Sequence, residues 1–336
     1  MKQLYVAWIE FQRRQISMAP HCGFELLFLP VERRVGKLRK LLTYLHNAWK
    51  TLEALRAMRV DAVWVQLPQV PLLWVALFYR RFFNQRATVI ADCHNKMFRP
   101  PWSRFPLGIS LLSRCDLVLV HNDDVLEAAV SLGVPRDCLE VVEDPPASFG
   151  TTPAQCGSFK EIPRPWLVFP ASFAEDEPLR ELLAAAAAVP DQSFIITGNV
   201  RNCREPELVA GAPANVHFVG FLSREEFDGL ITGCDAVVAL TRFDGIQLSV
   251  CGEAVGAGKP MLISDTSTLR RLFPAGGVFV RPDSPDDIAS GARELMARLS
   301  ELREAALEQR QELTARWFQT RGKQMLELVS APLNGR

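Results

Sequence analysis

Residues 236–264 read AVVALTRFDGIQLSVCGEAVGAGKPMLIS, and this stretch decides the fold that the sequence predicts. Residues 236–240 form a short apolar run, which is typical of a strand buried on both faces of a parallel sheet. A polar loop follows, and the small apolar residues after it predict a helix with Ser249 as its N-cap and Gly258 as its end. Because residues 261–264 are again a short apolar run, the stretch predicts a strand–helix–strand unit.

Two carboxylates, Asp244 and Glu253, lie in or near the loop of this unit. The start of a helix offers unpaired backbone N–H groups and the positive end of the helix dipole, and together these bind phosphate. A carboxylate one turn into the helix, such as Glu253, can accept hydrogen bonds from both hydroxyls of a ribose, and Asp244 can reach a sugar beyond the phosphates. The loop therefore favours a nucleotide diphosphate sugar as ligand. The alternative is an ordinary acidic loop, with Glu253 only a first-turn helix carboxylate.

The second half of the stretch resembles the donor-site signature of glycosyltransferase family 4, a large retaining family with the GT-B fold. That signature places two acidic residues around a loop and a helix start, followed by E-A-x-x-x-G-K-P, and residues 253–260 match the second part in full. The first part departs, because eight residues separate Asp244 from Glu253 where the family has seven between two glutamates. Gly245 occupies the expected position instead.

The resemblance implies roles for particular residues of the second half. Thr241-Arg242 with Gln247 is similar to the loop of a subgroup that carries a comparable extra residue. Many relatives supply an Arg and a Lys for the pyrophosphate in the loop after the strand at 166–170, whereas this chain has three acidic residues at 175–177. The residues implied to bind the donor are Glu253, Gly245, Ile246, Gln247, Leu248, Ser249, Arg242, Ser172, Gly198 and Phe221.

The first half carries candidates at the ends of its predicted strands. His94 follows the apolar run 87–91, and ligands of α/β proteins bind at such strand ends. A histidine in this region of the family lines the cleft near the transferred sugar, so the resemblance implies that His94 is catalytic together with Asp244. The alternative is a structural histidine. Arginines in the loop after the first strand could bind an acceptor phosphate, or be a surface pair without function. The candidate acceptor-binding residues are Arg13, Arg14, Asn95 and His121.

Composition limits the class of protein. The chain has 336 residues, enough for two α/β domains of about 150 residues each. It is 48% hydrophobic and 23% charged, as in soluble globular proteins. No apolar run reaches the ~18 residues of a membrane span, and MKQLYVAWIEF at the start predicts a strand rather than a signal peptide. Eight cysteines form no C-x-x-C pair, so we expect free, mostly buried thiols in a reducing cytoplasm.

The net charge of zero hides an asymmetry. Residues 1–115 carry a net charge of +12 and the rest of the chain −12. A basic half favours an anionic membrane surface or a phosphate-bearing acceptor, and no nucleic-acid-binding motif accompanies it. Solvated surface charge is the alternative. The apolar, aromatic segment 68–83, which contains Arg80 and Arg81, predicts a core helix, a helix in the membrane interface, or both.

We therefore expect an α/β protein of the GT-B type, with two doubly wound Rossmann-like domains facing each other across a cleft. Residues 1–150 would bind the acceptor and residues 163–308 the nucleotide-sugar donor, with 148–165 containing the linker. The C-terminal segment 309–336 would pack back on the first domain.

The expected activity is that of a retaining hexosyltransferase, which moves a sugar from a nucleotide diphosphate sugar to a hydroxyl acceptor, with lipid-linked and polysaccharide acceptors as options. No cofactor and no metal are expected, because the sequence has no Asp-x-Asp triplet. The expected location is the cytoplasm, with peripheral binding to the inner face of the cell membrane as an option. Two alternatives stay open: a nucleotide-sugar epimerase or other GT-B enzyme, and a partner protein that kept the fold without turnover.

Overall fold

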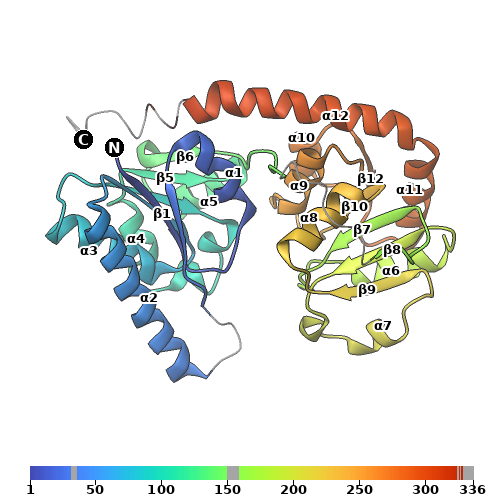
Figure 1. The fold of residues 1–336 in the computed structure, drawn as a ribbon, viewed down its shortest axis with the longest axis horizontal. Helices are drawn as coiled ribbons and strands as arrows, with labels where there is room; N and C mark the ends of the chain where they lie inside the picture. The colour runs from blue at the N-terminus through green and yellow to red at the C-terminus, as the bar shows by residue number, and fades with distance from the viewer. Residues whose placement is uncertain (32–35, 150–158, 324, 326, 328–336) are drawn as a thin grey trace. The chain divides into compact units, whose positions relative to one another are not determined.

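The chain forms two compact units in the computed structural model. One consists of Met1–Pro145 with Arg316–Arg336, and the other of Pro146–Ala315 (Figure 1). The residues that the structure describes are 1–31, 36–149, 159–323, 325 and 327. The region predicted to contain the linker lies partly outside them, as does part of the basic segment before the second helix.

The first unit is built on a six-stranded parallel sheet with the order β2-β1-β3-β4-β5-β6. The strands are β1 Gln3–Ala7, β2 Glu25–Phe28, β3 Ala62–Leu67, β4 Thr88–Cys93, β5 Leu117–Val120 and β6 Leu139–Val141. The helices are α1 Arg13–Cys22, α2 Lys37–Met58, α3 Val70–Phe82, α4 Gly108–Leu112 and α5 Asp123–Ser131. There are also short 3-10 helices, η1 Asn95–Phe98, η2 Trp102–Arg104 and η3 Arg136–Cys138, and a π-helix, η6 Trp317–Gly322.

Both faces of this sheet are covered, which explains why its central strands read as continuous apolar runs. On one face, alternate strand residues such as Val63 and Val89 pack with α2, α3, α4 and α5. On the other face, Tyr5 and Ile90 pack with α1 and with Trp317 from the C-terminal segment. The indole of Trp317 donates a hydrogen bond of 3.0 Å to the carbonyl of Glu143, which fastens the segment to this unit.

The second unit repeats the plan with a six-stranded parallel sheet of order β12-β11-β10-β7-β8-β9. The strands are β7 Trp166–Pro170, β8 Ser193–Thr197, β9 Val216–Gly220, β10 Ala236–Ala239, β11 Met261–Ser264 and β12 Gly277–Val280. The helices are α6 Leu179–Ala187, α7 Pro206–Ala210, α8 Arg224–Gly233, α9 Ser249–Ala257, α10 Ser267–Leu272, α11 Pro285–Ala297 and α12 Leu299–Arg316, with a short turn η5 Val200–Asn202.

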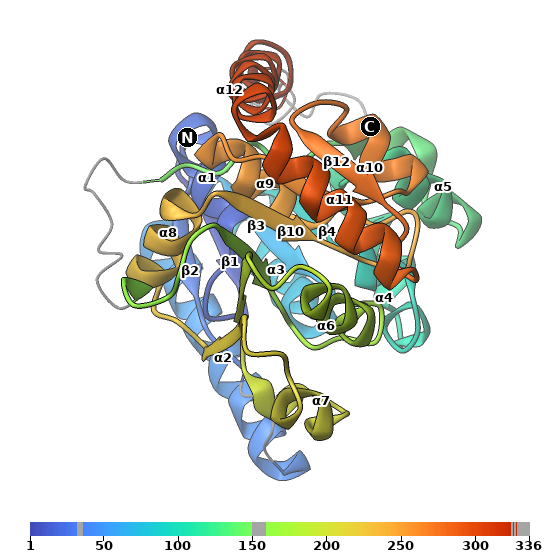
Figure 2. The same cartoon turned by 90° about the vertical axis from the view of Figure 1, so that its right-hand side faces the viewer.

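Two apolar layers again enclose the second sheet. Helices α6 and α11 cover one face and α8, α9 and α10 the other (Figure 2). Helix α9 needs a small residue where the chain before β7 passes it, because a Cβ on Gly256 would lie 2.1 Å from the carbonyl oxygen of Ala147. Ala147 also donates a backbone hydrogen bond of 3.0 Å to Gly252, so the chain entering this unit runs directly against α9.

The fold prediction of two doubly wound α/β units is confirmed, and so is the strand–helix–strand unit at its centre. Two local predictions were wrong. The N-cap of α9 is Leu248, not Ser249, which is already the first helical residue. Arg13 and Arg14 lie in the first turn of α1 rather than in a loop, because Gln12 is the last extended residue before the helix.

The cysteines behave as predicted wherever the structure describes them. None of the described cysteines forms a disulfide, and all of them but Cys203 are buried. Among the described residues, no helix is both long enough and apolar enough to cross a membrane.

Candidate functional site

Each sheet has one point where the strand order reverses, and the candidate residues gather there. In the first sheet this point lies between β1 and β3, and in the second between β7 and β10. Ligands of open α/β sheets bind outside the carboxyl ends of the strands at such points. The two groups of residues are therefore a first-unit cluster after β1, β3, β4, β5 and β6, and a second-unit loop pair after β7 and β10.

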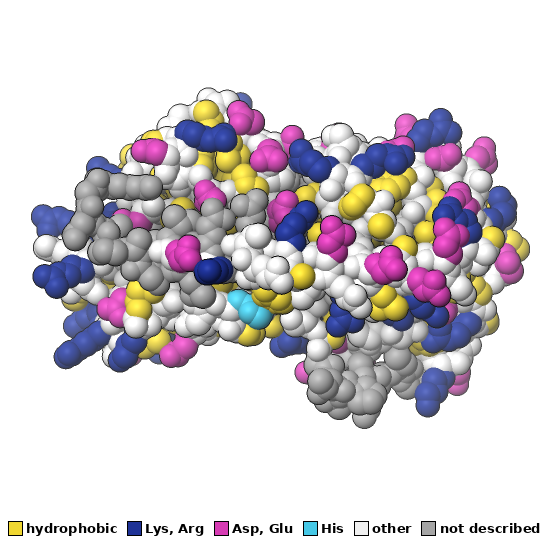
Figure 3. All heavy atoms as spheres, turned by 90° about the horizontal axis from the view of Figure 1, so that it is seen from above, with side chains coloured by type: hydrophobic (Ala, Val, Ile, Leu, Met, Phe, Trp, Pro, Cys, Tyr) yellow, Lys and Arg dark blue, Asp and Glu magenta, His cyan; other side chains and the backbone are white. Residues whose placement is uncertain are grey.

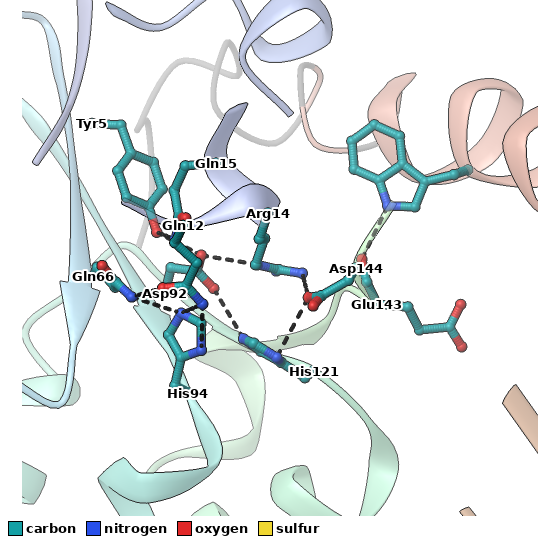
Figure 4. Close-up of polar contacts among 11 residues, drawn as sticks. Tyr5, Gln12, Arg14, Gln15, Gln66, Asp92, His94, His121, Glu143 and Asp144 are labelled. Carbon is teal, nitrogen blue, oxygen red and sulfur yellow. Dashed lines mark hydrogen bonds and ion pairs between the residues drawn. The ribbon is translucent and has the colours of Figure 1, made fainter. Parts of the chain in front are cut away.

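Arg14 is the centre of the first-unit cluster, and it is buried rather than exposed (Figure 4). Its Nε donates a hydrogen bond of 3.0 Å to Oδ2 of Asp92, on β4, and its Nη1 donates to Asp144, just after β6. The hydroxyl of Tyr5 donates to the same Asp92 oxygen at 2.6 Å. A guanidinium between two carboxylates joins three parts of the unit that are far apart in sequence.

His121 lies against the same two carboxylates. Its Nε2 is 3.7 Å from Oδ1 of Asp92, and its Nδ1 is 3.5 Å from Oδ1 of Asp144. Neither His121 Nε2 nor Asp92 Oδ1 has a hydrogen-bond partner, although both atoms are buried. This side of the cluster thus has polar atoms that a bound hydroxyl could satisfy.

His94 sits beside His121, with the two ring centroids 4.5 Å apart. The amide nitrogen of Gln12 lies 3.2 and 3.1 Å from its two ring nitrogens, and that of Gln66 lies 3.1 Å from Nε2. Gln66 also donates to the amide oxygen of Gln12. Gln12, the N-cap of α1, and Gln66, on β3, therefore fix the orientation of the His94 ring.

The electrostatics of the cluster keep His94 neutral and the carboxylates charged. Burial, followed by the repulsion of His121, lowers the pKa of His94 from its ordinary value of 6.5 to about 3. Burial opposes the charge of Asp92, but the Arg14 guanidinium and His121 outweigh it and hold the pKa of that carboxyl well below its usual range. The pKa of Asp144 is lowered in the same way, by His121 and then Arg14 against burial. A neutral imidazole can accept or donate a hydrogen bond to a sugar hydroxyl.

The neutral state of His94 predicts a pH dependence of stability. Between about pH 3 and pH 6.5 the unfolded chain binds a proton on this histidine and the folded chain does not, so stability rises with pH across this window. One proton corresponds to a slope of about 1.4 kcal/mol per pH unit. We expect His94→Gln to lower the slope of the unfolding free energy against pH by up to this amount, measured by urea titration from pH 4 to 7. His46→Gln, at an exposed position, is the control, and an unchanged slope in His94→Gln would contradict the assignment.

The same cluster includes a group with the composition of a metal site. The ligand atoms of Asp92, His94 and His121 lie within 4.8 Å of one another. The guanidinium of Arg14 already balances the charge of Asp92, which reduces the attraction of the group for a cation. The three side chains are therefore of types that bind metals, but the positive charge of Arg14 beside them disfavours a cation.

The predicted acceptor-binding residues have different surroundings. Arg14 and His121 lie in the cluster, while Arg13 is buried with its guanidinium 5.3 Å from the centroid of the Phe11 ring. Asn95 begins η1 directly after His94. Arg14 is thus already paired with carboxylates of its own unit, and acceptor binding by these four residues stays a prediction.

In the second unit, Asp244 organises the loop after β10. Its carboxylate accepts hydrogen bonds from the backbone N–H of Gly245 at 2.8 Å, from that of Thr268 at 3.1 Å, and from the hydroxyl of Ser267 at 2.7 Å. The Ser267 hydrogen bond is the main reason that the pKa of Asp244 lies below its usual value. Asp244 therefore accepts hydrogen bonds from the first backbone N–H groups of α10, whose N-cap is Thr266, and a catalytic role for Asp244 stays a prediction.

Glu253 lies one turn into α9, the helix that follows this loop. The carboxylate residue is buried, with 8% of its surface exposed. The N-cap residue Leu248 makes no side-chain hydrogen bond, so no side chain at that position satisfies the first N–H groups of the helix. An uncapped helix start with a carboxylate one turn behind it is the arrangement that the sequence predicted for phosphates and a ribose. The intervening loop contains the predicted donor residues Gly245, Ile246, Gln247, Leu248 and Ser249, and the amide oxygen of Gln247 is buried without a partner.

Arg242 ties this loop to the loop after β7. Its backbone N–H donates a hydrogen bond of 2.8 Å to the carbonyl of Asp176. In its guanidinium, Nη1 donates to the carbonyl of Glu177 and Nη2 donates to the carboxylate of Glu181 on α6. The guanidinium of Arg242, a predicted donor-binding residue, is therefore already engaged with the acidic loop. A donor that uses it would have to compete with these contacts.

Glu177 occupies the backbone amides of the loop after β7. Its carboxylate accepts hydrogen bonds from the N–H of Ser172 at 3.0 and 3.1 Å, from the Ser172 hydroxyl at 2.7 Å, and from the N–H of Phe173 at 2.7 Å. Phe173 has a positive φ of 58°, and successive amides turned inward in this way form an anion-binding nest. The chain thus fills a nest next to the switch point with its own carboxylate.

The remaining predicted donor residues lie near the same edge of the sheet. Gly198, at the end of β8, has a φ of 108°, and a Cβ there would lie 2.0 Å from the carbonyl oxygen of Ala171. Only glycine allows the loop after β7 to approach so closely. Phe221 follows β9 and is 79% exposed, so its ring lies in water in this structure.

Sequence reasoning missed five members of these groups: Asp92, Asp144, Gln12, Gln66 and Glu177. Asp92 gave a signal, since it is a carboxylate at the end of a strand that is otherwise apolar. The others stand in polar loops or, like Gln66, at a strand end, where nothing in the local sequence distinguishes them.

Solved structures of the GT-B class share this fold of two doubly wound units. Anabaena HepE in complex with UDP-glucose matches at a TM-score of 0.70 and 14% identity, with 97% of this chain and 98% of that chain covered. Sucrose-phosphate synthase of Thermosynechococcus elongatus also matches at 0.70 and 14% identity, with 98% of each chain covered. UDP-GlcNAc 2-epimerase of Neisseria meningitidis matches at 0.60 and 17% identity, covering 97% and 99%.

The family comparison points to the second unit. Residues 164–298 match the family described as "Glycosyl transferases group 1". Over this segment of the chain, the resemblance to GT-B glycosyltransferases is therefore confirmed. No curated protein matches the chain.

Proposed function

We propose that the protein is a retaining glycosyltransferase that transfers a hexose from a nucleotide diphosphate sugar to a hydroxyl acceptor. The observation that carries the proposal is the loop and helix start between β10 and α9. There an uncapped helix N-terminus and the buried carboxylate of Glu253 stand together at the reversal point of the sheet. The family match over residues 164–298 and the UDP-glucose bound by HepE support the same choice of donor.

The division of roles follows from the two groups of residues. Glu253 would accept the ribose hydroxyls, and the first N–H groups of α9 would bind the pyrophosphate, whose negative charge grows as the sugar leaves. In the first unit, the neutral ring of His94 would hydrogen-bond the transferred sugar. No metal is needed for this division of roles.

The test is a donor panel. Purified protein is incubated with UDP-, GDP- and ADP-hexoses, first alone and then with lipid-phosphate-linked and free saccharide acceptors, and released nucleotide diphosphate is measured. We expect release with one nucleotide class, beginning with UDP-glucose, and an acceptor-dependent increase. The anomeric configuration of the product, read by NMR, tests retention. Conversion of the sugar to its epimer without transfer would favour an epimerase instead.

A non-catalytic partner protein is the second candidate, and one observation favours it. The loop after β7 lacks the basic pair of many relatives, and Glu177 fills its amide nest. Donor binding without nucleotide diphosphate release, under every acceptor tried, would support this candidate and reject the transferase.

The proposed acceptor is lipid-linked, and the proposed location is the cytoplasmic face of the membrane. The net charge of +12 on residues 1–115 supports both, because anionic lipid surfaces and phosphate-linked acceptors attract positive charge. If transfer occurs to soluble saccharides but never to a phosphate-linked lipid, this part of the proposal is rejected while the transferase activity stands.

A further inference from the structure

The first half of α2 carries an exposed apolar stripe that the fold does not explain. The stripe consists of Leu38, Leu41, Leu42, Leu45 and Trp49, which are between 56% and 72% exposed. Figure 1 shows that the first turns of α2 project beyond the sheet of their unit. At 100° per residue the five side chains fall within one face about 100° wide, as in an amphipathic helix.

The face of α2 that packs on its own unit lies opposite the stripe. Asn47, Thr51 and Leu55 are its buried residues. The amide of Asn47 donates to the carbonyl of Leu29 at 2.9 Å, and the indole of Trp8 donates to the hydroxyl of Thr51 at 3.1 Å. The helix is held by this face, and more than half of each side chain of the leucine stripe stays exposed. Contiguous exposed apolar residues of this kind mark an interaction surface.

Basic residues flank the stripe. Exposed or partly exposed Lys37, Arg39, Lys40 and Lys50 lie along the same helix, and residues 37–49 contain no Asp or Glu. The ammonium of Lys50 lies 4.6 Å from the centroid of the Trp49 ring. By contrast, Figure 3 shows a face of the molecule where acidic and basic side chains are interspersed. Leucines, a tryptophan and lysines on one helix are the composition of helices that lie in the interface of anionic bilayers.

Helix α3, which packs beside α2, has the same division of faces. Leu72, Leu73 and Ala76 are buried, whereas Phe78 and Phe82 are exposed, with their ring centroids 4.7 Å apart. Segment 68–83 is therefore a core helix on one face and has exposed aromatic side chains on the other, which fits the prediction that it could serve both purposes.

We propose that the α2 stripe is a membrane-docking surface, which inserts into the headgroup region of a bilayer rich in anionic lipid. A second copy of the chain is a poorer occupant, since two such helices would bring their positive charges together with no acidic residue in 37–49 to pair them. An anionic surface satisfies both the apolar stripe and its basic flanks. The inference concerns binding only and does not rest on the proposed transferase activity.

The test is sedimentation of the full chain with vesicles of phosphatidylcholine alone and with vesicles that also contain the anionic lipid phosphatidylglycerol. We expect binding to the anionic vesicles that weakens as salt rises, because the attraction between lysines and headgroups is screened. Leu41→Glu should lower the partition coefficient at least about tenfold, since it removes buried apolar area and adds a repelled charge. Lys37→Gln/Lys40→Gln should lower it on anionic vesicles only.

Leu132→Glu, at an exposed leucine of α5's C-terminal end, is the matched control and should bind as the wild type does. Circular dichroism and donor binding of each variant should be unchanged, which separates a docking defect from a folding or donor-site defect. Equal vesicle binding by Leu41→Glu and wild type would overturn the proposal. So would a wild-type dimer, seen by sedimentation equilibrium, that Leu41→Glu converts to a monomer, because the stripe would then bind a second copy.

Discussion

Glu253→Gln is expected to lower the affinity for the nucleotide-sugar donor about 100-fold, with the fold intact. The change keeps the volume of the side chain in α9 but removes its charge. Hydrogen bonds to a charged group contribute about 1.5–3 kcal/mol each, and two ribose hydroxyls would lose this charge assistance together. Because only 8% of Glu253 is exposed, little water would screen the hydrogen bonds between its carboxylate and the ribose hydroxyls in the wild type.

Calorimetric titration with the donor that the panel identifies is the measurement. Glu207→Gln, an exposed glutamate on α7 in the same unit, serves as the control and should leave the affinity unchanged. Glu253→Ala should abolish binding, with circular dichroism confirming that the helix remains. Wild-type affinity in Glu253→Gln would reject the ribose assignment, and with it the residue on which the proposed function depends most.

Arg14→Leu should lower the free energy of unfolding of the first unit by about 3–5 kcal/mol, because it leaves the buried Asp92 and the partly buried Asp144 without their cation. Asp92 is fully buried, so its charge cannot be solvated by water once Arg14 is gone. Hydrogen exchange of the β1 and β4 amides, followed by mass spectrometry, reports the stability of this unit separately from the other.

Arg136→Leu is the control for this prediction. It breaks the exposed ion pair with Glu127, which should cost under about 1 kcal/mol. Arg14→Leu combined with Asp92→Asn should recover part of the loss, since the second change removes one unpaired charge. A loss in Arg14→Leu no larger than that in Arg136→Leu would show that the buried pair does not stabilise the unit.

The stability from Asp92 also has a defined sign with pH. The folded pKa of this carboxyl lies well below the unfolded value of about 4, so its contribution is present above that value and is lost as pH falls toward the folded pKa. Acid should therefore lower the unfolding free energy of the first unit through Asp92 and His94 together. The Asp92→Asn change should remove only the loss of stability that occurs below about pH 4.

Local sequence was sufficient for the elements of the fold. Apolar runs such as 236–240 and 261–264 have the length of strands in a buried sheet, and residues 253–260 carry a signature of their own. Helix boundaries were less secure at Ser249 and at Arg13, where capping depends on backbone angles that neighbouring residues impose.

The sequence by itself determined two doubly wound units, a helix start with a carboxylate behind it, and a basic first half, since each depends on residues close together in the chain. Only the tertiary structure decided which charges are already matched. It pairs Arg14 with carboxylates 78 and 130 residues away, and it directs the leucines of α2 outward by packing the opposite face. The physical reason is that burial and pairing of a side chain depend on segments distant in sequence, which no local pattern specifies.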